Sequence, residues 1–129
     1  MATRSLIGYY NKADGSVTAT TCHWDGYVEH NGATLEGHYA TDADARAISA
    51  AGYISCLRDT VDLSLDDADI YAPLQYESVE AYMNMAAKEG AEYAYLWDSK
   101  AWFVSDQTAD DIRFTDVATV LAENAYNNL

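Results

Sequence analysis

Aromatic side chains constrain this chain more than any other feature of its sequence. Eleven tyrosines, three tryptophans and two phenylalanines occur in 129 residues, whereas leucine, isoleucine, valine and phenylalanine together supply only 23. Such a thin aliphatic content, combined with high charge, is typical of disordered chains. Each buried aromatic ring, however, removes roughly 150–250 Å² of surface from water, which offsets the missing aliphatic area. The sequence therefore predicts a folded domain whose core is built on aromatic rings.

The length of the chain favours one domain, because domains most often have roughly 100–150 residues. Two segments have the pattern of a β-hairpin, with β-prone runs on both sides of a turn rich in Asn, Asp, Gly or Ser. They pair residues 5–10 with 17–22 and residues 92–97 with 101–105. We expect a single compact α+β domain over residues 1–129, in which these two hairpins form a sheet that about four helices pack against.

Four segments carry the start signals and the apolar spacing of helices. A short extended run over residues 54–57 lies between the second and third of them. The expected helices begin at caps Asn31, Thr41, Ser78 and Thr115; the second carries Ala47, Ile48 and Ala51 inward until Gly52, and the third ends near Glu89.

Charge limits the classes of partner. The chain has 21 Asp and Glu against 7 Lys and Arg, which gives a formal net charge of −14. Nucleic-acid affinity comes mainly from Lys and Arg, and anionic membranes attract the same residues, so direct binding to either is not expected. No apolar run approaches the ~20 residues that span a bilayer, and residues 1–5 lack a secretory signal. We therefore expect a cytoplasmic protein.

The densest run of reactive side chains extends from Cys22 to His30. It begins with a turn formed by Cys22, His23, Trp24, Asp25, Gly26 and Tyr27. In an extended segment Cys22 and His23 point to opposite sides, so they cannot act as nucleophile and base. We expect a structural turn with Trp24 buried, in which the side chains of His23 and Asp25 bind nearby backbone. The alternative is a zinc-type site, whose ligands would be His23, Asp25, His30 and His38.

Cysteine usage gives no sign of a disulfide framework, because Cys22 and Cys56 are too few and lack a Cys-x-x-Cys spacing. Both are expected to be reduced thiols. We expect no metal and no cofactor. The sequence also lacks the Gly-rich phosphate loops and the Gly-x-Ser-x-Gly motif that would support a nucleotide enzyme or a serine hydrolase.

An acidic connector joins the two halves of the chain between Arg58 and Pro73. It opens like a calcium loop, but Asp67 and Pro73 stand where such a loop needs its Gly and its bidentate Glu. A solvated acidic face is the interpretation we favour, and this face is a candidate interaction surface. Its candidate residues are Asp62, Asp66, Asp67 and Asp69.

The second hairpin carries one aromatic face, in which Tyr93, Tyr95 and Trp97 alternate with Ala94 and Leu96. Two interpretations stay open. The face is core that packs against the helix capped by Ser78, or part of it is exposed and anchors a protein partner.

Three blocks of the chain, residues 1–8, 22–32 and 90–96, resemble a family of small uncharacterised tailed-bacteriophage proteins that is common in marine and cyanobacterial phages. The block Cys22 to Tyr27 is the most specific part of the likeness, although that family usually has Pro where this chain has Val28. The family has no established catalytic residues to carry over. The resemblance implies a phage-encoded accessory protein, made in the cytoplasm of the infected bacterium, that acts on host machinery or host defence.

Two functions of different classes follow from these features. The first is a non-enzymatic interaction protein, whose acidic surface binds a host protein with a basic face, one that normally holds nucleic acid. The alternative is a small-ligand binder that sequesters a nucleotide-like signal. Its stacking residues would be Trp24, Tyr27 or Trp97, and its phosphate-binding residues Arg4, Arg46, Arg58 or Arg113.

Overall fold

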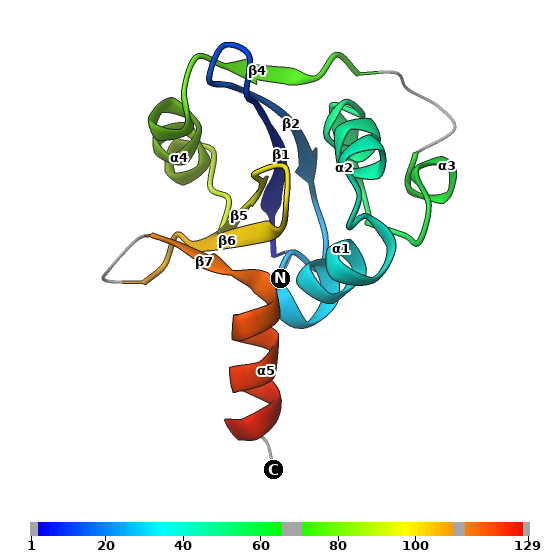
Figure 1. The fold of residues 1–129 in the computed structure, drawn as a ribbon, viewed down its shortest axis with the longest axis vertical. Helices are drawn as coiled ribbons and strands as arrows, with labels where there is room; N and C mark the ends of the chain where they lie inside the picture. Colours follow the sequence, from blue (N-terminus) through cyan, green and yellow to red (C-terminus); the bar gives the residue numbers. More distant parts are fainter. Residues whose placement is uncertain (1–2, 66–70, 110–112, 128–129) are drawn as a thin grey trace.

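The computed structural model describes residues 3–65, 71–109 and 113–127, and these ranges form a mixed seven-stranded sheet with helices on both faces (Figure 1). The sheet order is β3-β2-β1-β5-β6-β7, and β4 also pairs with β2. The strands are β1 Ser5–Asn11, β2 Ser16–Cys22, β3 Tyr53–Ile54, β4 Leu74–Tyr76, β5 Tyr93–Trp97, β6 Trp102–Asp106 and β7 Phe114–Asp116.

Both predicted hairpins are confirmed, as β1–β2 and β5–β6. They join because β1 runs parallel to β5, with Ser5 opposite Tyr93 and Tyr9 opposite Trp97. The α+β class is confirmed, but the sheet is larger than expected. The extended run expected over 54–57 is the two-residue strand β3, and β4 and β7 were not predicted, since three residues are too few to show an alternating pattern.

The helices divide between the two faces of the sheet: α4 covers one face and α1 and α2 the other, while α5 extends away from one end of the sheet (Figure 1). Within the described ranges, none of them is long and apolar enough to cross a membrane. They are the π-helix η1 Val28–Gly32 and the α-helices α1 Ala33–His38, α2 Asp42–Ser49, α3 Val61–Ser64, α4 Val79–Lys88 and α5 Val117–Asn127.

Two of the four predicted caps are confirmed. The Thr41 hydroxyl accepts from the Asp44 N–H, and the Ser78 hydroxyl accepts from the Ala81 N–H. The other two are wrong: Asn31 is buried inside η1, and the carboxylate of Asp116, rather than Thr115, accepts from the N–H of Thr119.

The inward face of α2 also differs from the prediction. Ala45, Ile48 and Ser49 are its buried residues, whereas Ala47 is exposed. Gly52 follows with a φ of 83°, a left-handed conformation that supports its predicted role as the end of this segment.

The aromatic face of the second hairpin does not pack against α4, which corrects one expectation. Tyr95 and Trp97 belong to the core beneath α1, α2 and α5, together with Trp102. The helix α4 instead lies on Ala94 and Leu96, the alternate residues of the same strand.

The reason for this division is steric. A large ring from α4, Tyr82, occupies that face and needs small residues beneath it. A Cβ on Gly8 would lie 3.0 Å from its ring. The Tyr82 hydroxyl donates to the carbonyl of Tyr95 at 2.6 Å, so the ring is also fixed at its polar end.

Buried tyrosines make the fold sensitive to alkali. Burial raises the pKa of Tyr82 and Tyr95 well above the ordinary value of 10.0, and burial with the nearby Glu89 raises the pKa of Tyr76 to about 12. Below the ordinary pKa these hydroxyls are neutral in both states, so stability is intact. Above it they ionise in the unfolded chain first, and stability falls as the pH rises toward the folded pKa values.

We therefore expect two phases in an alkaline titration. In the first phase, tyrosinate forms at exposed tyrosines while the far-ultraviolet circular dichroism stays constant. The buried ones form tyrosinate only as the circular dichroism is lost. Complete tyrosinate formation with an unchanged circular dichroism would contradict the burial of Tyr82 and Tyr95.

Candidate functional site

The loop between β2 and η1, residues 23–27, is fixed by main-chain hydrogen bonds; we call it the aromatic loop. The N–H groups of His23 and Trp24 donate to the carbonyls of Ile54 and Ser55, and the Gly26 N–H donates to the carbonyl of Thr3 at 2.8 Å. A Cβ on Gly26 would lie 2.8 Å from that same carbonyl oxygen, so the close approach requires glycine. The loop is therefore rigid without help from its side chains.

The prediction that Trp24 is buried is wrong. Trp24 is 45% exposed and Tyr27 is 39% exposed. The space beneath the loop is occupied by Tyr95, which is fully buried and whose hydroxyl donates to the Gly26 carbonyl at 2.7 Å. Asp25, with a φ of 58°, turns the chain at this point.

The side chains of the loop form ring contacts rather than the predicted hydrogen bonds. Those of His23 and Asp25 make no hydrogen bond to another described residue. The His23 ring instead stands edge-on to Trp24 with the centroids 4.7 Å apart, and His30 stands edge-on to Tyr27 at 6.1 Å. Two aromatic residues are thus displayed, each with an imidazole beside it.

Beneath the loop, Cys22 is a packing residue. Its Sγ accepts from the amide of Asn31 at 3.4 Å, and the same amide donates to the Ser5 hydroxyl. Burial raises the pKa of the Cys22 thiol, which disfavours the reactive thiolate. Cys22 and Cys56 are both free thiols, in line with the predicted reduced state.

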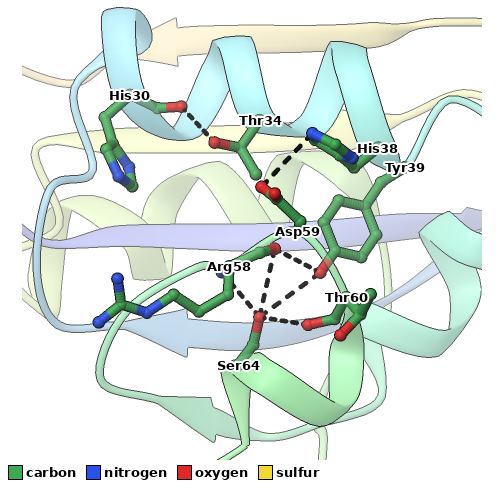
Figure 2. Close-up of polar contacts among 8 residues, drawn as sticks. All are labelled: His30, Thr34, His38, Tyr39, Arg58, Asp59, Thr60 and Ser64. Carbon is green, nitrogen blue, oxygen red and sulfur yellow. Dashed lines mark hydrogen bonds and ion pairs between the residues drawn. The ribbon is translucent and has the colours of Figure 1, made fainter.

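The four residues considered as metal ligands do not converge. His30 lies in the middle of η1 and His38 is the last residue of α1, where it reaches a carboxylate oxygen of Asp59 at 3.4 Å (Figure 2). Within the described ranges, no group of three or more His, Cys, Asp or Glu residues is placed to hold a metal ion.

The beginning of the acidic connector is structured. The Ser64 hydroxyl accepts from the Arg58 N–H and donates to the Thr60 carbonyl, both at 2.8 Å, and the Tyr39 hydroxyl donates to the Arg58 carbonyl at 2.7 Å (Figure 2). This network holds α3, on which Asp62 is exposed. The other predicted residues of this surface, Asp66, Asp67 and Asp69, lie outside the described residues.

The remaining candidates do not form one surface. Of the two interpretations of the aromatic face, the structure agrees with the one in which the face belongs to the core. Tyr95 and Trp97 are buried, and Tyr93 is half-buried. The arginines proposed for phosphate do not gather either, because Arg46 and Arg113 line two different hollows.

A hollow of about 330 Å³ lies near the aromatic loop, between η1, the strands β5 to β7 and α5, and its charged lining residues are Glu29, Asp106 and Arg113. Glu29 lines it, and its carboxylate accepts from the Asn124 amide at 2.8 Å. Burial, and then Asp106, Glu29 and Glu92, raise the pKa of Tyr93 in its wall. Three carboxylates therefore act on one tyrosine in a hollow that Arg113 also lines.

The prediction of a structural turn did not expect the aromatic loop to be exposed, and only the alternative of a small-ligand binder used Trp24 and Tyr27 as contact residues. A signal of this exposure was present, since a Trp and a Tyr flank Asp25 and Gly26 in a connecting segment, and such segments usually run over the surface. Comparison with protein-family models, with curated proteins and with solved structures finds no match for this chain.

Proposed function

We propose that the protein is a non-enzymatic interaction protein. Its partner is another protein, which it binds at a basic face of that partner. The observation that carries this proposal is the exposure of Trp24 and Tyr27 on a loop whose backbone is fixed. Tryptophan and tyrosine are enriched among the residues that dominate binding energy, and rings on a rigid backbone lose little conformational freedom when they bind.

The charge of the chain specifies the partner. The net charge is −14, because 21 Asp and Glu stand against 7 Lys and Arg, so most of the carboxylates have no Lys or Arg to pair with. Opposed potentials accelerate association and suppress partners of like charge. A Lys or Arg side chain of the partner can lie over the ring of Trp24 or Tyr27 while neighbouring cations approach Glu29.

The setting of this interaction follows from the resemblance to small phage proteins. The partner is then a protein of the infected bacterium, met in its cytoplasm, whose basic face normally holds nucleic acid. Occupation of that face by an acidic protein would compete with the nucleic acid. Host takeover or inhibition of a host defence is the consequence that we propose.

The double variant Trp24→Ala/Tyr27→Ala is expected to remain folded and to lose the partner. Both rings are exposed, so their truncation leaves the core intact, whereas truncation of an interface anchor typically costs about 2 kcal/mol or more of binding energy. The measurement is a pull-down from bacterial lysate, with the retained proteins identified by mass spectrometry. The wild-type chain should retain a basic protein that rising salt releases, because screening weakens exposed charge pairs.

Tyr71→Ala is the matched control, since Tyr71 is 43% exposed and lies outside the aromatic loop. It should retain the same basic protein as the wild type. The proposal fails if the double variant retains that protein as well as the control does, or if the retained protein is indifferent to salt. Glu29→Gln should weaken retention without abolishing it.

A further inference from the structure

A second hollow lies at the other end of β1 from the aromatic loop, beyond the carboxyl ends of the parallel strands β1 and β5. It has a volume of about 280 Å³ and is lined by Tyr9, Asn11, Lys12, Asp42, Arg46 and Ser99. After β1 the chain turns to β2, and after β5 it turns to β6, so the two connections lead toward opposite edges of the sheet.

Arg46 is held at this hollow by buried residues, although its own side chain is 70% exposed. Its guanidinium carbon lies 5.0 Å from the centroid of the Tyr9 ring, and Nη2 donates to the Tyr9 hydroxyl at 3.1 Å. That hydroxyl in turn donates to the carboxylate of Asp42, at 2.8 and 2.9 Å to its two oxygens. The indole of Trp97 donates to the same carboxylate at 3.2 Å.

This chain of contacts preorganises a surface cation. Tyr9 is 6% exposed and Trp97 is 3% exposed, so the groups that orient Arg46 are themselves fixed in the core. A long side chain that is already ordered loses less freedom when a ligand binds. One N–H of Arg46 reaches Tyr9, and the planar fork of the guanidinium suits an oxyanion.

The local charge at this hollow is opposite to that of the molecule. Lys12 and Arg46 bring two positive charges. Asp42 brings one negative charge, because the hydrogen bond from Tyr9, with a smaller contribution from Trp97, holds its pKa below the usual range. Asp42 and Arg46 approach only to 4.0 Å, and the Asp42 carboxylate already accepts from the Tyr9 hydroxyl and the Trp97 indole. An anion is therefore attracted to this hollow, although the net charge of the whole chain, −14, repels anions elsewhere on the surface.

We propose that this hollow binds the phosphate group of a small phosphorylated molecule, with Arg46 and Lys12 as its cationic ligands and the Ser99 hydroxyl as a further donor. The volume fits a phosphate on a small body rather than a whole dinucleotide, since pockets for drug-sized ligands occupy roughly 300–1,000 Å³. The site does not depend on the proposed protein partner, because the aromatic loop lies at the opposite end of β1.

The test uses the full chain, labelled for NMR, and inorganic phosphate as the probe. Phosphate should shift the backbone signals of Lys12 and Ser99 and the Nε signal of Arg46 along a saturable curve. Sodium chloride at equal ionic strength should not. Acetate should bind more weakly than phosphate, and equal binding of the two would overturn the assignment to phosphate.

Three variants make the test specific. Arg46→Gln should weaken phosphate binding by about tenfold or more, as expected for the loss of a charged hydrogen-bond donor. Lys88→Gln removes one positive charge from an exposed residue at the end of α4, away from this hollow, and should leave binding unchanged. Tyr9→Phe keeps every charge but removes the hydroxyl that orients Arg46, and it should weaken binding to an intermediate degree. An equal effect of Arg46→Gln and Lys88→Gln, or no saturation with phosphate, would overturn the proposal.

Discussion

Replacing Trp102 by alanine is expected to leave most of the protein unfolded at room temperature. The Trp102 side chain is fully buried, and its ring centroid lies 5.5 Å from that of Trp97 in the core beneath α1, α2 and α5. Truncation of a buried tryptophan costs about 3–5 kcal/mol, in part because the cavity does not collapse. The Trp102 indole also donates to the Tyr39 carbonyl at 3.0 Å. Its loss leaves that buried acceptor unpaired, at a further cost of about 1–3 kcal/mol.

These costs compare with the roughly 5–15 kcal/mol that stabilise a whole domain, so the folded state of Trp102→Ala has little margin. Urea unfolding followed by circular dichroism measures the effect. Phe103→Ala is the matched control, because Phe103 is the next residue of β6 and is only partly buried. It should remain folded with a modest loss of stability. A Trp102→Ala protein as stable as the Phe103→Ala protein would show that the aromatic core is not where the stability lies.

What the sequence revealed about the fold was local. Each hairpin is specified by alternation and by a turn within about twenty residues, and Thr41 and Ser78 mark helix starts within a few positions. The parallel pairing of β1 with β5 joins Ser5 to Tyr93. No local pattern encodes such a pairing, so the order of the strands was beyond prediction. The alternation of large and small residues in β5 assigns them to the two faces of the sheet, but it does not predict which helix covers each face.

The errors at the candidate site have the same origin. A tryptophan is expected to be buried because its ring is large and mostly apolar, but Tyr95 enters the same space from a strand some seventy residues away along the chain. Asn31 has the residue type of a helix cap. Its amide instead satisfies two buried groups, the hydroxyl of Ser5 and the thiol of Cys22. In both cases the role of a residue depends on contacts with residues from other parts of the chain. Patterns of neighbouring residues in the sequence carry no information on such contacts.

Gly52→Ala is expected to be strongly destabilising. Gly52 has a φ of 83°, and a Cβ there would lie 2.6 Å from the Ala72 carbonyl oxygen and 2.7 Å from that of Tyr71. Its own N–H donates to the Thr20 hydroxyl at 3.0 Å, and its carbonyl accepts from the Thr21 N–H. Gly52 therefore cannot move away from the clash without breaking its bonds to β2.

Two other glycines separate the causes of this effect. Gly90 has a φ of 77°, but a Cβ there would meet nothing within 4 Å, and Gly37 has open space inside α1 without a positive φ. Gly90→Ala should therefore cost only the left-handed strain, about 1–2 kcal/mol. Gly37→Ala should be neutral or stabilising by about 0.5–1 kcal/mol, because alanine is the better helix former.

The melting temperature should be lowest for Gly52→Ala, intermediate for Gly90→Ala and highest for Gly37→Ala. Gly52→Ala adds a backbone clash, typically about 1–3 kcal/mol, to the strain that Gly90→Ala carries alone. At roughly 2–8 °C per kcal/mol for small domains, Gly52→Ala should melt several degrees below Gly90→Ala, and Gly37→Ala should melt at or above the wild type. Equal melting temperatures for Gly52→Ala and Gly90→Ala would mean that residues 71–72 yield to the new methyl group. In that case the contact of this segment with Gly52 adds no stability to the fold.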